Sequence, residues 1–166
     1  DDFIAWGLAA SGGSDYGVAG SVAINVVDMT NEAATGTGAT LKATNGGIDV
    51  TARHTLGAQL LAGGGGFGQD EAGVGAAVAL NLILHHDTLA TIGTGTRTDA
   101  TGATHVTATA AFVPLKADVP LLPDDADPGF TAAALSGGIS KGDAAVGGSV
   151  VINVVDLRTE ATIGDD

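Results

Sequence analysis

The segment Asp124-Asp125-Ala126-Asp127-Pro128-Gly129 holds the densest group of side chains that could do chemistry. Its three carboxylates could surround a hard cation, because calcium takes oxygen ligands from several side chains at once. The segment has no glutamate at the closing position of an EF-hand loop, and its proline stiffens the turn. Asp124, Asp125 and Asp127 are therefore candidate calcium ligands, with a solvated acidic loop as the alternative interpretation.

A second candidate for calcium lies in residues 65–73, which fit the calcium-roll nonapeptide GGxGxDxUx. Asp70 takes the acidic position of this pattern and Ala72 the apolar one. Calcium rolls take their ligands from successive turns, whereas this chain has a single copy of the pattern. We therefore favour a glycine-rich backbone corner here and keep Asp70 as a metal candidate beside the three aspartates of residues 124–127.

The run His85-His86-Asp87 could hold a transition metal. Adjacent side chains on a strand point to opposite faces, so both histidines could bind one metal only with distortion. The chain has no cysteine to help, and it has no nucleophile elbow, phosphate loop or HExxH motif. We expect no enzyme, no catalytic residues and no cofactor other than calcium.

A phrase that occurs three times reveals the elements that must position these residues. Residues 20–36 return as residues 76–93 and again as residues 148–164. The equivalent asparagines Asn25, Asn81 and Asn153 give spacings of 56 (25 to 81) and 72 (81 to 153). Repetition at such periods indicates an array in which each repeat buries an apolar face against its neighbours.

The repeated phrase has the two-residue period of a strand. Val22 and Ile24 lie on one face, and Ala23 and Asn25 on the other. We expect the larger aliphatic face to point into the core, and Ile152→Asp to unfold the third repeat. Since the second face is also largely apolar, a second layer or lateral copies of the chain should cover it.

These patterns predict an all-β repeat array over residues 1–166, with repeats at about 1–47, 48–103 and 104–166. A parallel β-solenoid is the favoured architecture, in which the three asparagines would form a ladder. An antiparallel hairpin array, reversing at Met29-Thr30-Asn31, and a β-sandwich are the alternatives.

An insert at residues 112–130 interrupts the third repeat. It contains all four prolines of the chain. It also accounts for most of the extra length by which the second spacing, 72, exceeds the first, 56. Because proline cannot donate to a strand ladder, we expect a loop that projects from the array. Insertions in repeat proteins often form the binding side, although a loop that only decorates or covers an edge is the alternative.

The composition excludes some partners. The formal net charge is −13, from 6 Lys and Arg against 19 Asp and Glu, which argues against nucleic acid as a partner. No apolar run is long enough for a transmembrane segment. The chain begins with Asp1 and stops within a repeat phrase, so we expect it to be a segment of a longer protein.

Residues 17–52, GVAGSVAINVVDMTNEAATGTGATLKATNGGIDVTA, resemble the repeats of large bacterial surface adhesins of the filamentous-haemagglutinin-like and autotransporter types. The resemblance covers all three repeats but not the insert at residues 112–130. It implies an elongated β-solenoid stalk outside the cell or on the bacterial surface, and it implies no catalytic residues.

We therefore expect a structural, non-enzymatic segment of a large extracellular or cell-surface protein, acting as an adhesin stalk or adhesive surface. Its partners would be neighbouring repeats, lateral copies, or a host-surface or glycan ligand. A calcium-stabilised binding module and a carbohydrate-active β-helix enzyme fragment are the alternatives.

Overall fold

The computed structural model describes residues 1–113, 130–142 and 144–165, and it is all-β. Strands make up 82% of the structure, and these residues form no helix. Valine, isoleucine and threonine recur along the chain, and their branched Cβ atoms favour extended backbone over helix. The prediction of an all-β fold is confirmed.

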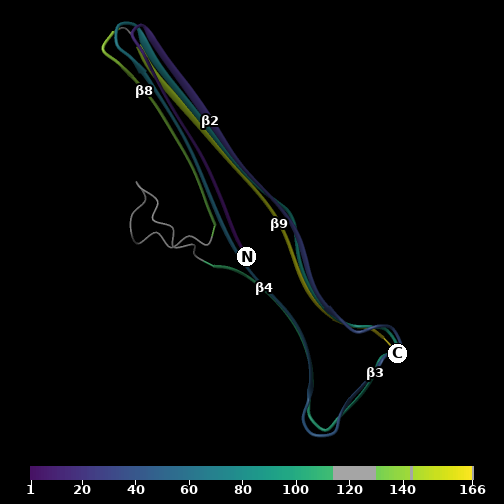
Figure 1. The fold of residues 1–166 in the computed structure, drawn as a ribbon. Helices are drawn as coiled ribbons and strands as arrows, with labels where there is room; N and C mark the ends of the chain where they lie inside the picture. The colour runs from purple at the N-terminus through teal and green to yellow at the C-terminus, as the bar shows by residue number, and fades with distance from the viewer. Residues whose placement is uncertain (114–129, 143, 166) are drawn as a thin grey trace. The chain divides into compact units, whose positions relative to one another are not determined.

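The chain is a succession of strands, of which β3 and β6 are short and the others long (Figure 1). The strands are β1 (Asp2–Gly13), β2 (Tyr16–Ala34), β3 (Thr40–Ala43), β4 (Ile48–Gly68), β5 (Ala72–Ile92), β6 (Arg97–Ala100), β7 (Thr104–Phe112), β8 (Phe130–Ser140) and β9 (Ala144–Ile163).

Strands from different repeats lie side by side. One sheet has the order β1-β4-β7, with β8 also paired to β4; the others have the orders β2-β5-β9 and β3-β6. The pairs β1–β4, β4–β8 and β3–β6 are parallel, and their registers are set by Asp2↔Gly57, Ala58↔Phe130 and Thr40↔Arg97. These partners are 55 (2 to 57), 72 (58 to 130) and 57 (40 to 97) residues apart, so the strand pairing follows the spacing of the repeated phrase.

The predicted chain reversal at Met29-Thr30-Asn31 is wrong. β2 runs without a break through these residues, from Tyr16 to Ala34. The polar side chains there alternate along an extended strand, which needs no turn to expose them to water. An antiparallel hairpin array is therefore excluded for β2.

The chain forms two compact units, each built from parts of all three repeats. The first unit comprises Asp1–Val26, Gly57–Leu82 and Phe112–Val154. The second unit comprises Val27–Leu56, Ile83–Ala111 and Val155–Asp166. β2, β4, β5 and β9 each contribute residues to both units.

In the first unit, the sheet of β1, β4 and β8 faces the sheet of β2, β5 and β9 at very short range. A Cβ added at Gly64 would overlap the backbone oxygen of Ala76, and one at Gly66 would overlap that of Val74. The glycines of residues 63–66 therefore lie inside β4 and do not form a corner, and Gly64 and Gly66 allow the backbones of the two sheets to approach. The only residues between β4 and β5 are Gln69, Asp70 and Glu71.

The core between these sheets is made of small side chains. Its buried cluster consists of Ala23, Leu60, Ala62, Ala77 and Ala79, with Ala5, Ala132 and Ala134 packed against it. Because the glycines bring the sheets so close together, most facing positions near them hold only a methyl group, and Leu60 is the one large side chain of the cluster.

The predicted inward face of the repeated phrase is wrong. Val22 and Ile24 are 60% and 54% exposed, whereas Ala23 and Val27 are buried. Ile152 of β9 is also exposed, so the expectation that Ile152→Asp unfolds the third repeat loses its basis. The predicted alternation is present in β2. Because the two sheets approach closely, the face with the smaller side chains packs between them, and the face with Val22 and Ile24 points outward.

The asparagines of the phrase occupy equivalent inward positions. Asn25 and Asn81 are buried, and Asn153 is exposed on β9. Within the described part of the chain, neither polar atom of the Asn81 side chain has a hydrogen-bond partner, so Asn81 makes no hydrogen bond to an equivalent asparagine. Asn81 is therefore a buried amide that costs free energy of folding.

The second unit has its own buried side chains. They include Val27 of β2, Leu56 of β4, and Ile83, His86, Thr88 and Ile92 of β5. Its turns use Gly38, Gly46 and Gly95, which have positive φ angles of 70°, 106° and 67°. Glycine adopts this left-handed backbone without steric cost.

Candidate functional site

The sequence placed its main metal candidates at Asp124, Asp125 and Asp127, and these lie outside the described residues. β7 ends at Phe112 and β8 begins at Phe130, and both strands border β4 in the same sheet. The insert at residues 112–130 therefore falls between two strands that are both neighbours of β4.

Asp70 lies in the turn between β4 and β5. Its backbone amide donates a hydrogen bond to the carbonyl oxygen of Ser14 at 2.8 Å. The backbone amide of Glu71 donates one to the backbone carbonyl oxygen of Asp15 at 3.1 Å. These backbone hydrogen bonds join the turn between β4 and β5 to the turn between β1 and β2. Asp70 and Glu71 remain exposed to solvent. In the described ranges no three His, Cys, Asp or Glu side chains are grouped so that they could hold a metal ion.

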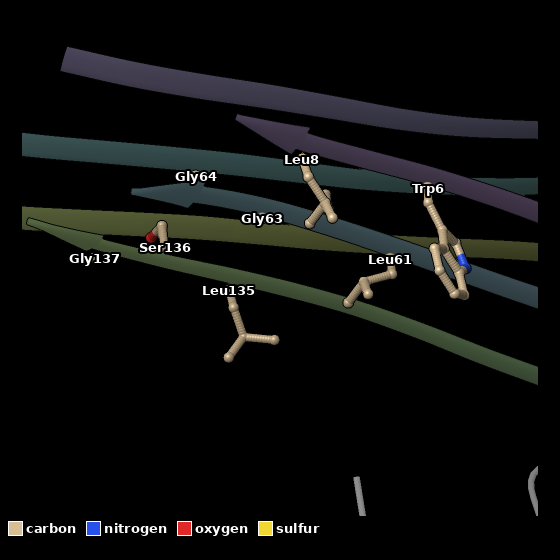
Figure 2. A pocket seen from close by; sticks show the side chains of 9 residues that line it. Trp6, Leu8, Leu61, Gly63, Gly64, Leu135, Ser136 and Gly137 are labelled. Carbon is tan, nitrogen blue, oxygen red and sulfur yellow. The ribbon is translucent and has the colours of Figure 1, made fainter. Parts of the chain in front are cut away.

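A groove lies on the outer face of the β1-β4-β8 sheet in the first unit (Figure 2). It has a volume of about 480 Å³ and is open to solvent on one side. Its lining residues are Trp6 and Leu8 of β1, Leu61, Ala62, Gly63 and Gly64 of β4, and Leu135, Ser136 and Gly137 of β8.

The strand register creates this groove. Leu8 of β1 and Leu135 of β8 flank Gly63 of β4 at the same level of the sheet. Because glycine has no side chain, the two leucines form walls above a floor of bare backbone. Trp6 pairs with Leu61 and closes one end of the floor.

The groove suits an apolar ligand. Figure 2 shows Leu135 pointing into the groove, while the hydroxyl of Ser136 points to the other side of its strand. Among the lining residues, Ser136 has the only polar side chain apart from the indole N–H of Trp6. A glycan needs several convergent hydrogen-bond partners, and this lining does not offer them.

The sequence reasoning missed this groove, although two signals of it were present. Ile4, Trp6 and Leu8 alternate along β1 with small residues, and a run of four glycines in β4 begins at Gly63, the partner of Leu8. Trp6 is the single tryptophan of the chain and is 53% exposed, so its fluorescence reports on the groove.

A buried histidine pair lies in the second unit. His54 Nδ1 and His86 Nε2 form a hydrogen bond, with the ring centroids 4.4 Å apart and the ring planes at 68°. His86 is 1% exposed, whereas the side chain of His85 is exposed and lies 3.6 Å from the carboxylate of Asp28. The prediction that adjacent histidines point to opposite faces is confirmed.

A one-residue bulge in β5 places His86 inside. Burial alternates along β5 except at Leu84 and His85, which are both exposed. The sequence carries a signal of this bulge, because Asn25 to Gly36 is one residue shorter than the equivalent stretch from Asn81 to Gly93. The sequence reasoning did not use this extra residue and missed the pair.

The surroundings lower the pKa of both histidines and so disfavour their charged form. Burial lowers the pKa of His86 below the usual value, the neighbouring His54 lowers it further, and Asp87 opposes the shift. Burial also lowers the pKa of His54. The Nδ1 atom of His86 has no hydrogen-bond partner among the described residues, so a proton there would be poorly solvated.

We expect the pair to make the second unit less stable in mild acid. The unfolded chain binds protons at the ordinary histidine pKa of about 6.5, whereas the folded pair binds them only at lower pH. Stability is therefore complete above about pH 6.5 and is lost as the pH falls through that value.

The measurement is thermal unfolding followed by circular dichroism at about pH 7.5 and about pH 5.5, above the range in which carboxylates titrate. His86→Phe should reduce the loss in acid, while His105→Gln, at an exposed histidine, should leave it unchanged. An equal loss of melting temperature in wild type and His86→Phe would show that the pair does not sense pH.

Among the described residues, no helix has the length and apolar character needed to cross a membrane.

Comparison with protein-family models, with curated proteins and with solved structures finds no match to this chain.

Proposed function

We propose that this chain is a structural, non-enzymatic segment of a large extracellular or cell-surface protein. In this proposal the three repeats are successive coils of a parallel β-solenoid, which serves as a stalk and presents an adhesive surface. Each coil holds its neighbours through strand pairing and through the small side chains between the sheets.

The observation that carries the proposal is the agreement between strand register and sequence repeat. β1 pairs with β4 at a separation of 55 residues, and β4 with β8 at a separation of 72. In a solenoid, equivalent residues of successive repeats pair in parallel, so that each added repeat forms one more coil on the last. Scaffolds and spacers use this property, whereas catalysis does not require it.

An adhesive role is supported by the apolar groove of the first unit. Trp6, Leu8 and Leu135 leave large apolar side chains in water, which a folded chain tolerates at a cost. Such a surface favours an apolar ligand group over a glycan.

The experiment that tests the proposal adds one coil. A second copy of residues 48–103 is inserted between Ala103 and Thr104, and unfolding is followed by circular dichroism. If the repeats are coils, the extra copy pairs on both sides, and both the strand content and the melting temperature should rise.

The control is a flexible Gly/Ser segment of the same length inserted at the same place. This segment should lower the melting temperature slightly, because a longer loop adds closure entropy. A repeat insertion that behaves like the Gly/Ser control, or that unfolds the chain, would contradict a solenoid built from these repeats.

A further inference from the structure

We propose that the outward face of β2, β5 and β9 in the first unit packs against the same face of a second copy of the chain. We call this surface the aliphatic face. This packing needs only the described sheet and does not depend on the proposed stalk.

The aliphatic face has an unusual composition. Along β2 the outward positions are those of Val18, Val22, Ile24 and Val26, and β5 and β9 present the equivalent residues. The outward residues are Tyr16, Val18, Gly20, Val22, Ile24 and Val26 of β2, Ala72, Val74, Ala76, Val78, Leu80 and Leu82 of β5, and Ala144, Val146, Gly148, Val150, Ile152 and Val154 of β9. None of these positions carries a charge, although the chain has a net charge of −13.

The exposed apolar residues of this face form one contiguous patch. The large residues of the two flanking strands, β2 and β9, are each about half exposed. Together with the partly buried residues of β5 they form an uncharged apolar surface over three neighbouring strands. Contiguous apolar patches are uncommon on monomeric proteins and mark surfaces at which proteins associate.

The shape of the face fits a copy of itself. Side chains repeat every second residue along each strand, and neighbouring strands are about 4.8 Å apart, so the β-branched side chains form a regular grid of ridges and gaps. Two such grids can interdigitate when sheets pack face to face, at a spacing of about 10 Å. A two-fold axis through the interface would place the same side chains on both sides.

Charge also favours a second copy over other occupants. Two chains of charge −13 repel each other, and a face without carboxylates is where they can meet at the lowest cost. An anionic lipid surface would require clustered Lys or Arg, and the outward positions of this face have none.

The test compares two lysine substitutions at aliphatic residues of similar exposure. Ile24 lies on β2 in the aliphatic face and is 54% exposed, while Ile139 lies on β8, in the opposite sheet, and is 60% exposed. Sedimentation velocity and light scattering over a range of concentrations give the mass, and circular dichroism shows whether each variant is folded.

We expect the wild-type chain and Ile139→Lys to have twice the monomer mass of 16.0 kDa. Ile24→Lys should raise the dissociation constant about 100-fold or more, because each copy then places a lysine against the apolar surface of the other. Added salt should strengthen wild-type association by screening the negative charge. If Ile24→Lys does not fold, Ile24→Thr, which keeps the β-branch, should weaken association about tenfold.

Three results would overturn the proposal: a monomeric wild-type chain at all concentrations, a folded Ile24→Lys that still dimerises like wild type, or dissociation by Ile139→Lys alone. A monomeric chain that sediments with phosphatidylcholine vesicles would overturn it in favour of lipid as the occupant. The coil-insertion experiment measures folding of the repeats, so failure of the stalk and failure of this packing are distinguishable.

Discussion

Gly66→Ala is expected to destabilise the first unit by about 3 kcal/mol or more, although it adds a single methyl group. A Cβ at Gly66 would overlap the backbone oxygens of Gly17 and Val74 and would lie 2.6 Å from the carbonyl carbon of Val74. These atoms belong to the paired backbone of β2 and β5, so they cannot move as the end of a flexible side chain could. The two sheets would have to separate, and the packing of the whole alanine core would loosen.

The control is Gly137→Ala, in β8 of the same sheet. A Cβ at Gly137 meets nothing within 4 Å, so the substitution should be neutral or stabilise by about 0.5 kcal/mol through the unfolded state. Urea unfolding followed by circular dichroism measures both variants. Equal midpoints for Gly66→Ala and Gly137→Ala would mean that the sheets do not approach backbone to backbone.

Leu60→Ala is expected to cost about 2–5 kcal/mol of the free energy of unfolding. Leu60 is the largest side chain of the buried cluster, and its buried neighbours there are Ala23, Ala62, Ala77 and Ala79. Alanines on strands cannot swing into the space that the leucine leaves, so the cavity would stay largely open.

Leu8→Ala provides the matched control for this cavity. Leu8 lies in the same sheet and is 71% exposed, whereas Leu60 is 1% exposed. The exposed substitution should change the free energy of unfolding by about 0.5 kcal/mol or less. A cost at Leu8 equal to that at Leu60 would mean that the core lies on the other side of the sheet.

The strand character and the parallel neighbours of this chain could be predicted well from the sequence. Asn25 and Asn81 mark equivalent places in β2 and β5, and their spacing is close to the separations at which β1 pairs with β4 and β3 with β6. Such repetition leaves few ways for the chain to satisfy the hydrogen-bonding groups of its backbone, since equivalent strands pair most readily with each other.

The candidate sites could be predicted only in part. The groove needs Leu8 and Leu135 on either side of Gly63, and residues this far apart in the sequence meet only through the register of three strands. The histidine pair depends on a bulge that turns His86 toward His54. Neither arrangement follows from local residue preferences, because each depends on which strands become neighbours.

The sequence by itself determined the repeat of this protein. Its strands alternate large and small side chains, and this pattern occurs three times. Only the tertiary structure decided which side of each strand is inside. Alternation places Val22 and Ile24 on one face of the strand and Ala23 and Asn25 on the other, but it does not determine which face points into the core. The close approach of β4 to β2 and β5 at Gly64 and Gly66 settled that direction, because the inward positions near these glycines are mostly filled by alanine, with Leu60 as the one large side chain of the buried cluster.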